Sequence, residues 1–383
     1  MKICVFTGAR AEYGLLKPVL DEIRNDTHFE LQLLVTGMHL STEFGLTYQI
    51  IEADGYAINE KVEMIISADT PTAICKSMGL GLIGISDALS RLKPDVMILL
   101  GDRFETLAGA TAALVCRVPI AHIQGGELTL GATDDAMRHS ITKMSLLHFT
   151  STEIYRRRVI QLGEDPTRVF NVGALNTEVI NSMGLLPREE LEARIGFKFG
   201  KTNCLVTFHP VTLEHNTADA QFQALLRVLQ DHLELHIIFT KTNADAEGRI
   251  INTLIDDFVN RNSQRAICFT SMGQLLYLST MRQVDVVLGN SSSGIIETPS
   301  FKLPTINIGD REKGRIRAAN IIDCEPNTRQ IAEALEQALN PVFLKSLQNM
   351  KNPYEKDSTA RNIKKIIGNF DYKNGLKKAF FDD

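Results

Sequence analysis

The sequence predicts an α/β protein built from two Rossmann-like, doubly wound domains that face a central cleft. Short apolar, β-branched runs alternate with longer amphipathic segments along the whole chain, and these runs form two series of about six. Strand–helix alternation is typical of parallel sheets with helices on both faces. Two such series favour two sheets over one very wide sheet. At roughly 150 residues per domain, a chain of 383 residues also predicts two or three domains.

The expected elements follow from these runs in chain order. The first series of strands is 3–7, 31–36, 96–100, 120–123, 147–150 and 169–172; the second is 204–208, 236–240, 266–269, 284–288, 305–308 and 321–323. Helical patterns are clearest over 15–24, 73–92, 218–229, 331–339 and 357–367. We therefore expect an N-terminal domain over 1–172 and a C-terminal domain over 173–354. The segment 355–383, with its helix, is expected to return to the first domain.

Composition excludes several classes of protein. The chain has 41 basic and 46 acidic side chains, a net charge of −5, which argues against a nucleic-acid partner. No run approaches the ~20 apolar residues of a membrane span, and the N-terminus lacks signal-peptide features. The six cysteines show no C-x-x-C spacing, so we interpret them as reduced thiols. We expect a cytoplasmic protein without a membrane partner.

Polar residues gather directly after the expected strands. The clusters are 8–10, 37–39, 101–103 and 125–127 in the first domain, and 209–210, 243–245, 290–294 and 309–311 in the second. The carboxyl ends of strands line the ligand crevice of open α/β sheets, so all eight clusters are expected around one cleft. Ordinary turn chemistry is the alternative. It explains the glycines and asparagines but not three arginines and two histidines.

The second domain contains a candidate phosphate site. Asn290 is followed by Ser291, Ser292, Ser293 and Gly294, after a buried strand and before an expected helix. Backbone N–H groups at a helix start attract phosphate, and serine hydroxyls add donors. An ordinary serine N-cap is the alternative.

Three charged residues extend this candidate site. Glu297 is placed to accept hydrogen bonds from ribose hydroxyls, while Arg10 and Arg311 on strand-end loops are expected to neutralise a diphosphate. A nucleoside diphosphate is the most economical ligand for the whole set. Taken singly, each arginine is more often a partner in a surface salt bridge.

One string resembles a dinucleotide fingerprint but lies in the wrong context. Gly79, Gly81 and Gly84 fit G-x-G-x-x-G, yet they fall inside the helical pattern 73–92 instead of directly after a strand. We interpret them as packing glycines and expect no NAD and no other cofactor.

Several acids and histidines are candidates for proton transfer. Asp102 and Glu127 each follow a strand, and Asp134 opens a helix on which Asp135 and His139 are one turn apart. For Asp134 or Asp135, helix capping is an equally good explanation. His209 also ends a strand and is expected to be catalytic or to contact phosphate. The spacing of the histidines and acids does not support a metal site.

These residues together resemble one family, the hydrolysing UDP-N-acetylglucosamine 2-epimerases of sialic-acid precursor synthesis. The motifs that carry the resemblance extend to about Arg317 and are Gly8-x-Arg10-x-x-Tyr13, Thr36-Gly37-Met38-His39, Gly101-Asp102-Arg103, His122-Ile123-x-Gly125-Gly126-Glu127, Arg138-His139-x-Ile141-x-Lys143, Phe208-His209-Pro210 and Gly289-Asn290-Ser291-Ser292-Ser293-Gly294.

The resemblance implies a GT-B-like fold, a UDP-sugar substrate and a homo-oligomer, either dimer or tetramer. It implies conversion of UDP-N-acetylglucosamine and water into N-acetylmannosamine and UDP, by elimination of UDP to a glycal and then hydration. Residues matching UDP contacts are Arg10, Arg103, His209, Asn243, Ser291, Ser292, Glu297 and Arg311. Asp102 and Asp134 match the family's catalytic acids.

One position departs from the family pattern. Gln124 stands where several relatives have a glutamate, and an amide is not a base, so Glu127 is expected to take over or share that role. Three alternatives stay open: an epimerase of UDP-2,4-diacetamido-2,4,6-trideoxy sugars for legionaminic acid, a GT-B glycosyltransferase, and an inactive UDP-sugar sensor.

Overall fold

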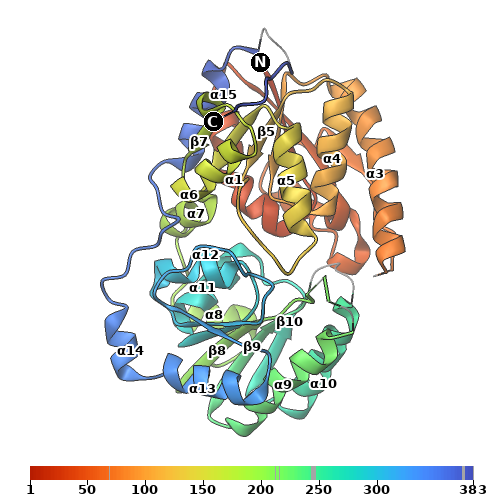
Figure 1. Ribbon diagram of the computed structural model, residues 1–383. Coiled ribbons are helices and arrows are strands. Elements are labelled where there is room, and N and C mark those ends of the chain that lie inside the picture. Colours follow the sequence, from red (N-terminus) through yellow and green to blue (C-terminus); the bar gives the residue numbers. More distant parts are fainter. Residues whose placement is uncertain (69, 212, 215, 243–246, 373–375, 383) are drawn as a thin grey trace. The chain divides into compact units, whose positions relative to one another are not determined.

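The computed structural model describes residues 1–383 except 69, 212, 215, 243–246, 373–375 and 383. It divides into two compact units, and each contains one parallel sheet, which confirms the predicted α/β fold class (Figure 1). Unit 1 consists of Met1–Glu127, Asp134–Val179 and Tyr354–Asp383. Unit 2 consists of Leu128–Thr133 and Ile180–Pro353.

Unit 1 is organised around a seven-stranded sheet in the order β3-β2-β1-β4-β5-β6-β7. Its strands are β1 (Lys2–Thr7), β2 (Glu30–Thr36), β3 (Glu60–Val62), β4 (Val96–Leu100), β5 (Ile120–Ile123), β6 (Leu147–Thr150) and β7 (Val169–Asn171). Its helices are α1 (Arg10–Arg24), α2 (Tyr48–Ala53), α3 (Pro71–Leu92), α4 (Phe104–Val115), α5 (Asp134–Met144), α6 (Glu153–Gln161) and α15 (Thr359–Asn369), while α7 (Leu175–Ser182) crosses the unit boundary.

Alternation along the strands divides the side chains of unit 1 between two cores. Ile3 and Val5 of β1 pack with α1 and α15, whereas Cys4 and Phe6 pack with α3 and α4. Because successive strand residues point to opposite faces, one apolar strand can bury both sides of the sheet. Figure 1 shows α3, α4 and α5 side by side in this unit.

The short strand β3 was not predicted. Only Val62 of its three residues is apolar, so the sequence carries no strand periodicity there. It forms because the chain pairs with β2, where Leu34 lies opposite Glu60 and Thr36 opposite Val62. Tertiary pairing therefore overrides the local sequence signal.

Unit 2 contains a six-stranded sheet in the order β10-β9-β8-β11-β12-β13. Its strands are β8 (Thr202–Thr207), β9 (Leu235–Thr240), β10 (Ala266–Phe269), β11 (Val286–Gly289), β12 (Thr305–Ile308) and β13 (Ile321–Cys324). Its helices are α8 (Arg188–Ile195), α9 (Ala218–Asp231), α10 (Gly248–Arg261), α11 (Gln274–Gln283), α12 (Ser293–Ile296), α13 (Thr328–Ala338) and α14 (Pro341–Ser346).

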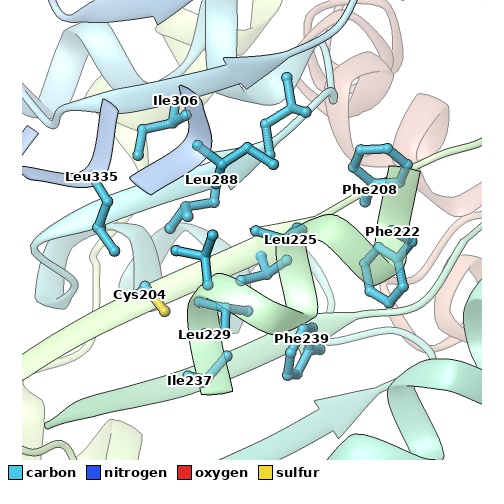
Figure 2. Close-up of a cluster of buried hydrophobic side chains, with 14 of the residues drawn as sticks. Cys204, Phe208, Phe222, Leu225, Leu229, Ile237, Phe239, Leu288, Ile306 and Leu335 are labelled. Atoms are coloured by element: carbon cyan, nitrogen blue, oxygen red, sulfur yellow. The ribbon is translucent and has the colours of Figure 1, made fainter. Parts of the chain in front are cut away.

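The larger core of unit 2 lies where α9, α10 and α13 cover the sheet. Figure 2 shows α9 contributing Phe222, Leu225 and Leu229 to this cluster. The opposite face of the sheet packs against α8 and α11, where Leu205 of β8 is fully buried. This arrangement holds the carboxyl ends of the strands in fixed register.

The unit boundaries differ from the sequence-based division at residues 172 and 173. The first unit extends through Val179, and Leu128–Thr133 groups with unit 2. Within unit 2, the amide of Leu130 donates to the carbonyl of Lys313 at 3.2 Å. Such a loop contact leaves no local pattern in the sequence. Tyr354–Asp383 lies in unit 1, where α15 contacts α1.

Helix α3 corrects the expectation that no apolar segment is long enough to cross a membrane. By length and composition α3 meets that criterion, alone among the helices searched in the described residues. One such helix is weak evidence of a membrane span, because apolar core helices meet the same criterion. Its inner face packs on the sheet of unit 1 through Ile85, Ala88 and Leu89.

Candidate functional site

Each sheet changes winding direction at one point in its strand order, and several predicted site residues lie at that point within their own unit. In unit 1 the point lies between β1 and β4, and in unit 2 between β8 and β11. Ligands of doubly wound sheets bind at this position, outside the carboxyl ends of the strands. Arg10 follows β1 and begins α1, while Asp102 and Arg103 follow β4. The fold of unit 1 therefore brings these three predicted residues to its switch point.

Arg138 of α5 joins two of the predicted acids in unit 1. Its guanidinium forms an ion pair with the carboxylate of Asp102 and donates to the backbone carbonyl of Glu127 at 2.8 Å. Arg138 is only 1% exposed, so this buried cation is compensated directly by a carboxylate. Sequence analysis quoted Arg138 in a motif but gave it no role.

Glu127 lies deeper than its neighbour Asp102. Its carboxylate is buried and accepts a hydrogen bond from the Ser151 hydroxyl at 2.8 Å. Ser151 directly follows β6, so the loops after β5 and β6 hold this carboxylate together. The expected role of Glu127 in proton transfer stays a prediction.

The start of α5 places two aspartates differently. Asp134 is the first helical residue, which fits the capping explanation as well as the catalytic one. Asp135 Oδ1 lies 3.7 Å from Arg138, and Asp135 Oδ2 lies 3.6 Å from the His139 ring, as the one-turn spacing predicted. Burial, opposed by the charge of Asp135, lowers the pKa of His139. His139 is therefore a candidate acceptor of a proton near neutral pH.

Two histidines and one glutamine hold loops of unit 1, and one of them contacts the backbone beside Asp102. The neutral ring of His122 hydrogen-bonds the carbonyl of Gly101 at 2.8 Å, and burial lowers the pKa of His122 to about 3. His39 is also buried, and burial lowers its pKa to about 4. Gln124 has a positive φ of 66° and donates its side-chain amide to Asn176 at 3.0 Å. These residues position the loops and carry no charge at neutral pH.

A pair of buried glutamates behind the switch point was missed by sequence analysis. Glu105 is fully buried and binds the Arg103 guanidinium at 3.1 Å, so Arg103 has a carboxylate partner inside the protein. Glu12 accepts hydrogen bonds from the amides of Gly8 at 2.8 Å and Ala9 at 3.3 Å. Burial and the charge of Glu105 raise the pKa of Glu12 to about 7.

Glu12 also explains why α1 begins earlier than expected. The apolar pattern indicated a helix from residue 15, but the helix begins at Arg10 because Glu12 satisfies backbone amides at its N-terminus. A glutamate at the third helical position was the available signal. Arg10 is thereby the first helical residue, and burial lowers its pKa.

In unit 2, Asn290 clamps the segment that contains His209. The backbone amide of His209 donates to the Asn290 side-chain oxygen at 2.7 Å, and the Asn290 amide donates back to the His209 carbonyl at 2.8 Å. Both side chains are buried. The preceding Gly289 has a φ of +139°, and a Cβ atom there would meet the Thr207 carbonyl at 1.8 Å. Glycine is therefore required where β11 ends against β8.

The serine loop is only partly as predicted. It follows β11, but α12 is a single turn, Ser293–Ile296, continued by the 3-10 helix Thr298–Phe301. A one-turn helix has a smaller macrodipole than a long helix, so binding of an anion would depend mainly on local N–H and O–H donors. Within the described residues, the amides of Ser291 and Ser292 donate to no protein acceptor.

Two further residues of the predicted set in unit 2 have protein partners. The Ser293 hydroxyl donates to Glu297 at 2.6 Å and is hydrogen-bonded to the Tyr277 hydroxyl at 2.9 Å. Burial and the charge of Glu297 raise the pKa of Tyr277 to about 12, so the phenol stays protonated. Ser293 therefore supports the loop, and Glu297 is fixed by it.

Arg311 lies beside the same loop. Its guanidinium donates to the carbonyl of Asn290 at 3.1 Å and pairs with Glu312 at 2.5 Å. Glu312 is buried and also pairs with Arg315 at 2.5 Å. A cation, a backbone loop with donors and His209 thus gather at the switch point of unit 2. Asn243, which was predicted to contact UDP, lies outside the described residues.

The residues at the carboxyl ends of the strands differ chemically between the two sheets. In unit 2, the carboxyl-end edge of the sheet offers N–H, O–H and guanidinium donors, which suit a phosphate. The corresponding edge in unit 1 offers the carboxylate of Asp102, paired with Arg138, together with a histidine and further acids, which suit proton transfer. No group of three or more His, Cys, Asp or Glu suited to a metal ion occurs in the described part of the chain.

Comparison with known proteins shows the family of the chain. Residues 21–368 match the UDP-N-acetylglucosamine 2-epimerase family. A Campylobacter jejuni protein named GDP/UDP-N,N'-diacetylbacillosamine 2-epimerase (hydrolyzing) is 46% identical, with 85% of each chain covered. Escherichia coli polysialic acid biosynthesis protein P7 is 39% identical, covering 100% of this chain and 97% of that protein. A Legionella pneumophila UDP-N,N'-diacetylbacillosamine 2-epimerase (hydrolyzing) is 35% identical, covering 90% of each chain.

Solved structures confirm the fold. The UDP-GlcNAc 2-epimerase of Neisseria meningitidis, solved with UDP-GlcNAc bound, superposes with a TM-score of 0.80 at 17% identity, covering 96% of this chain and 99% of that one. A structure titled putative UDP-N-acetylglucosamine 2-epimerase from Listeria monocytogenes also gives a TM-score of 0.80, at 16% identity, covering 100% and 99%. This fold is the expected GT-B-like arrangement of two Rossmann-like sheets. With 348 consecutive residues inside the family match, the chain belongs to the UDP-N-acetylglucosamine 2-epimerase family.

Proposed function

We propose that this protein is a hydrolysing 2-epimerase of UDP-linked 2-acetamido sugars. The observation that carries the proposal is the ion pair of the Asp102 carboxylate with the buried Arg138 at the switch point of unit 1, where Arg138 also donates to the backbone carbonyl of Glu127. We assign proton transfer to unit 1 and UDP binding to unit 2. The names of the 46% and 35% identical relatives include the word hydrolyzing, which supports the proposed hydrolysing activity.

The reaction begins with loss of UDP. The bond between C1 and the phosphate oxygen breaks, and the diphosphate takes the electron pair while Ser291, Ser292 and Arg311 bind its charge. A base removes the proton from C2, so a C1–C2 double bond forms and the intermediate is a glycal. Asp102 is the proposed base, and its carboxylate stabilises the positive charge that develops at C1 in this step.

Hydration completes the reaction. Water supplies a hydroxyl to C1, and an acid delivers a proton to C2 from the face opposite to the one that lost it. We propose that Asp134 and Glu127 transfer these protons and that His209 contacts the phosphate. The net change is UDP-sugar plus water to UDP plus the free sugar inverted at C2.

Two sugars are candidates. The relatives at 46% and 35% identity are both named diacetylbacillosamine 2-epimerases, which favours the UDP-2,4-diacetamido-2,4,6-trideoxy sugar. The family match and the 39% identical polysialic acid protein, aligned over the whole chain, favour UDP-N-acetylglucosamine and release of N-acetylmannosamine. We place the reaction in the cytoplasm, which the six free cysteines support.

A panel of UDP-linked donors tests this function. Purified protein is incubated separately with UDP-N-acetylglucosamine and with UDP-N,N'-diacetylbacillosamine, and the products are identified by NMR. The proposal predicts UDP and a free C2-inverted sugar from at least one donor without any acceptor. Turnover that occurs only after a hydroxyl acceptor is added would instead identify a glycosyltransferase, and UDP binding without turnover would identify a sensor.

A further inference from the structure

We propose that the C-terminal segment of the chain positions helix α5 for the proposed reaction, by fastening the loop after α6 to the C-terminal end of that helix. The segment acts through Lys378, Phe380 and Phe381, which are called here the C-terminal clasp. Helix α5 carries the proposed site residues Asp134 and Arg138, so the inference rests on the function proposed above and adds positioning residues to it. Sequence analysis expected the segment to return to the first domain but gave its last residues no role.

Glu164, in the loop after α6, is the point where the clasp meets α5. It is only 1% exposed. One carboxylate oxygen accepts a hydrogen bond from Lys143, in the last turn of α5, at 2.6 Å. The other accepts from Lys378 at 2.7 Å and lies 3.0 Å from the His148 ring of β6. A single buried carboxylate therefore joins the helix, the sheet and the C-terminal segment.

The charge of Glu164 is balanced by these partners. Burial raises the pKa of Glu164, but hydrogen bonds from His148, Lys143 and Lys378 outweigh burial and lower it to about 2. The carboxylate is therefore ionised at neutral pH. Removing one partner of a buried ion pair is destabilising, because the remaining charge is left uncompensated. Loss of Lys378 is thus expected to disturb the packing of Glu164 against α5.

Lys378 also binds the end of α5 directly. Its ammonium group donates to the backbone carbonyl of Ser145 at 2.8 Å, and Ser145 directly follows the helix. The last carbonyls of a helix have no donor within the helix, and cations near this end are favourable. Lys143 ties the same end to the loop by donating to the carbonyl of Leu162 at 3.1 Å. Two lysines therefore hold the C-terminal end of α5.

The two phenylalanines of the clasp fasten the chain to the loop after α6. The amide of Phe381 donates to the carbonyl of Gly163 at 3.0 Å. A Cβ atom on Gly163 would lie 2.3 Å from the ring of Phe380, so the ring packs where a larger residue would not fit. The ammonium group of Lys143 lies 5.0 Å from the centroid of the same ring, within the range of a cation–π contact. Although Phe380 is 61% exposed, its ring therefore contacts both the loop and α5.

Helix α5 connects the clasp to the proposed site. Arg138 lies five residues before Lys143, about 7.5 Å along the helix axis. Arg138 in turn pairs with Asp102 and donates to the carbonyl of Glu127. A displacement of the end of α5 would therefore move this guanidinium, and a misplacement of about 1 Å can lower a rate by about 100-fold. The clasp residues are positioning residues that act through Arg138.

Lys378→Met tests the clasp in the full chain. The variant should lower kcat by about tenfold, because α5 loses one of its two lysine contacts, while UDP affinity, assigned to unit 2, stays unchanged. Lys378→Arg can donate to the same two acceptors and should recover most of kcat. The matched control is Lys377→Met, at an exposed lysine next to the clasp, which should keep the wild-type kcat. Equal kcat values for Lys378→Met and Lys377→Met would overturn the inference.

Hydrogen exchange measures the same effect without turnover. In Lys378→Met, amides in the last turn of α5 should exchange about tenfold faster than in the wild type, while amides of β1 keep their wild-type rates. Unchanged exchange in α5, or faster exchange throughout unit 1, would overturn the positioning role. If no UDP-linked donor is turned over by the wild type, the proposed function fails, whereas this measurement still decides whether the clasp holds α5.

Phe380→Ala provides a second variant with little risk of misfolding, because the ring is largely exposed. Loss of its contact with Lys143 should lower kcat by about threefold and speed exchange in the last turn of α5. If Lys378→Met does not fold, wild-type kcat and wild-type α5 exchange in Phe380→Ala would overturn the inference.

Discussion

Glu12 provides the sharpest test of the electrostatics of unit 1. Its carboxyl is buried next to Glu105, and its pKa rises from an ordinary 4.5 to about 7. A raised pKa means that the folded state holds the proton more tightly than the unfolded state. Stability from this group is therefore complete below pH 4.5 and is lost as the pH rises through 7. The difference corresponds to roughly 3 kcal/mol of unfolding free energy.

Replacing Glu12 with Gln should remove this pH dependence. The amide oxygen of Gln still accepts from the amides of Gly8 and Ala9, so little stability should be lost near pH 5. Between pH 5 and 8 the wild type should lose roughly 3 kcal/mol relative to Glu12→Gln. Urea unfolding, followed through hydrogen exchange of β1 amides, measures unit 1 at each pH. Parallel curves for the two proteins would refute the reasoning, and Glu63→Gln, at an exposed position, is the control.

Other variants separate the remaining roles. Asp102→Asn should lower turnover by roughly 100-fold or more while UDP affinity, measured by calorimetry, stays unchanged; normal turnover would exclude Asp102 from the chemistry. Ser291→Ala combined with Ser292→Ala should weaken UDP binding by about 30-fold, and undiminished affinity would remove the anion site. Gly289→Ala should cost about 3 kcal/mol or more, because its Cβ atom would lie 1.8 Å from a carbonyl of β8. Gly184→Ala, with open space around it, should be tolerated in the same thermal unfolding assay.

Alternation of strands and helices predicted most of the fold. The strands at 96–100, 120–123, 147–150, 266–269 and 305–308 have the bounds that the apolar runs indicated. β3 was missed because it has only one apolar residue, and its pairing with β2 is a long-range property. The start of α1 was missed because a buried glutamate, and not an apolar period, determines it.

The candidate site was predictable in outline only. The polar residues after strands could be found because parallel strands bring their carboxyl ends to one edge. The partners of those residues could not be found in this way. Arg138 pairs with Asp102 from 36 positions away in the sequence, so no local spacing reveals that contact. Glu105 pairs with Arg103 only two positions away, but its complete burial depends on the fold of the unit. The sequence indicated a helix after the serine loop without its length, and the structure limits α12 to one turn before a 3-10 helix that contains Pro299.

Solvent deuterium incorporation tests the central proposal most directly. The protein is incubated in deuterated water with the donor that it consumes, and the released sugar is analysed by proton NMR and mass spectrometry. Exchange of the C2 proton with solvent during elimination and hydration predicts a C2-inverted free sugar that carries one deuterium at C2. A released sugar that retains its original hydrogen and configuration at C2 would contradict the proposed reaction.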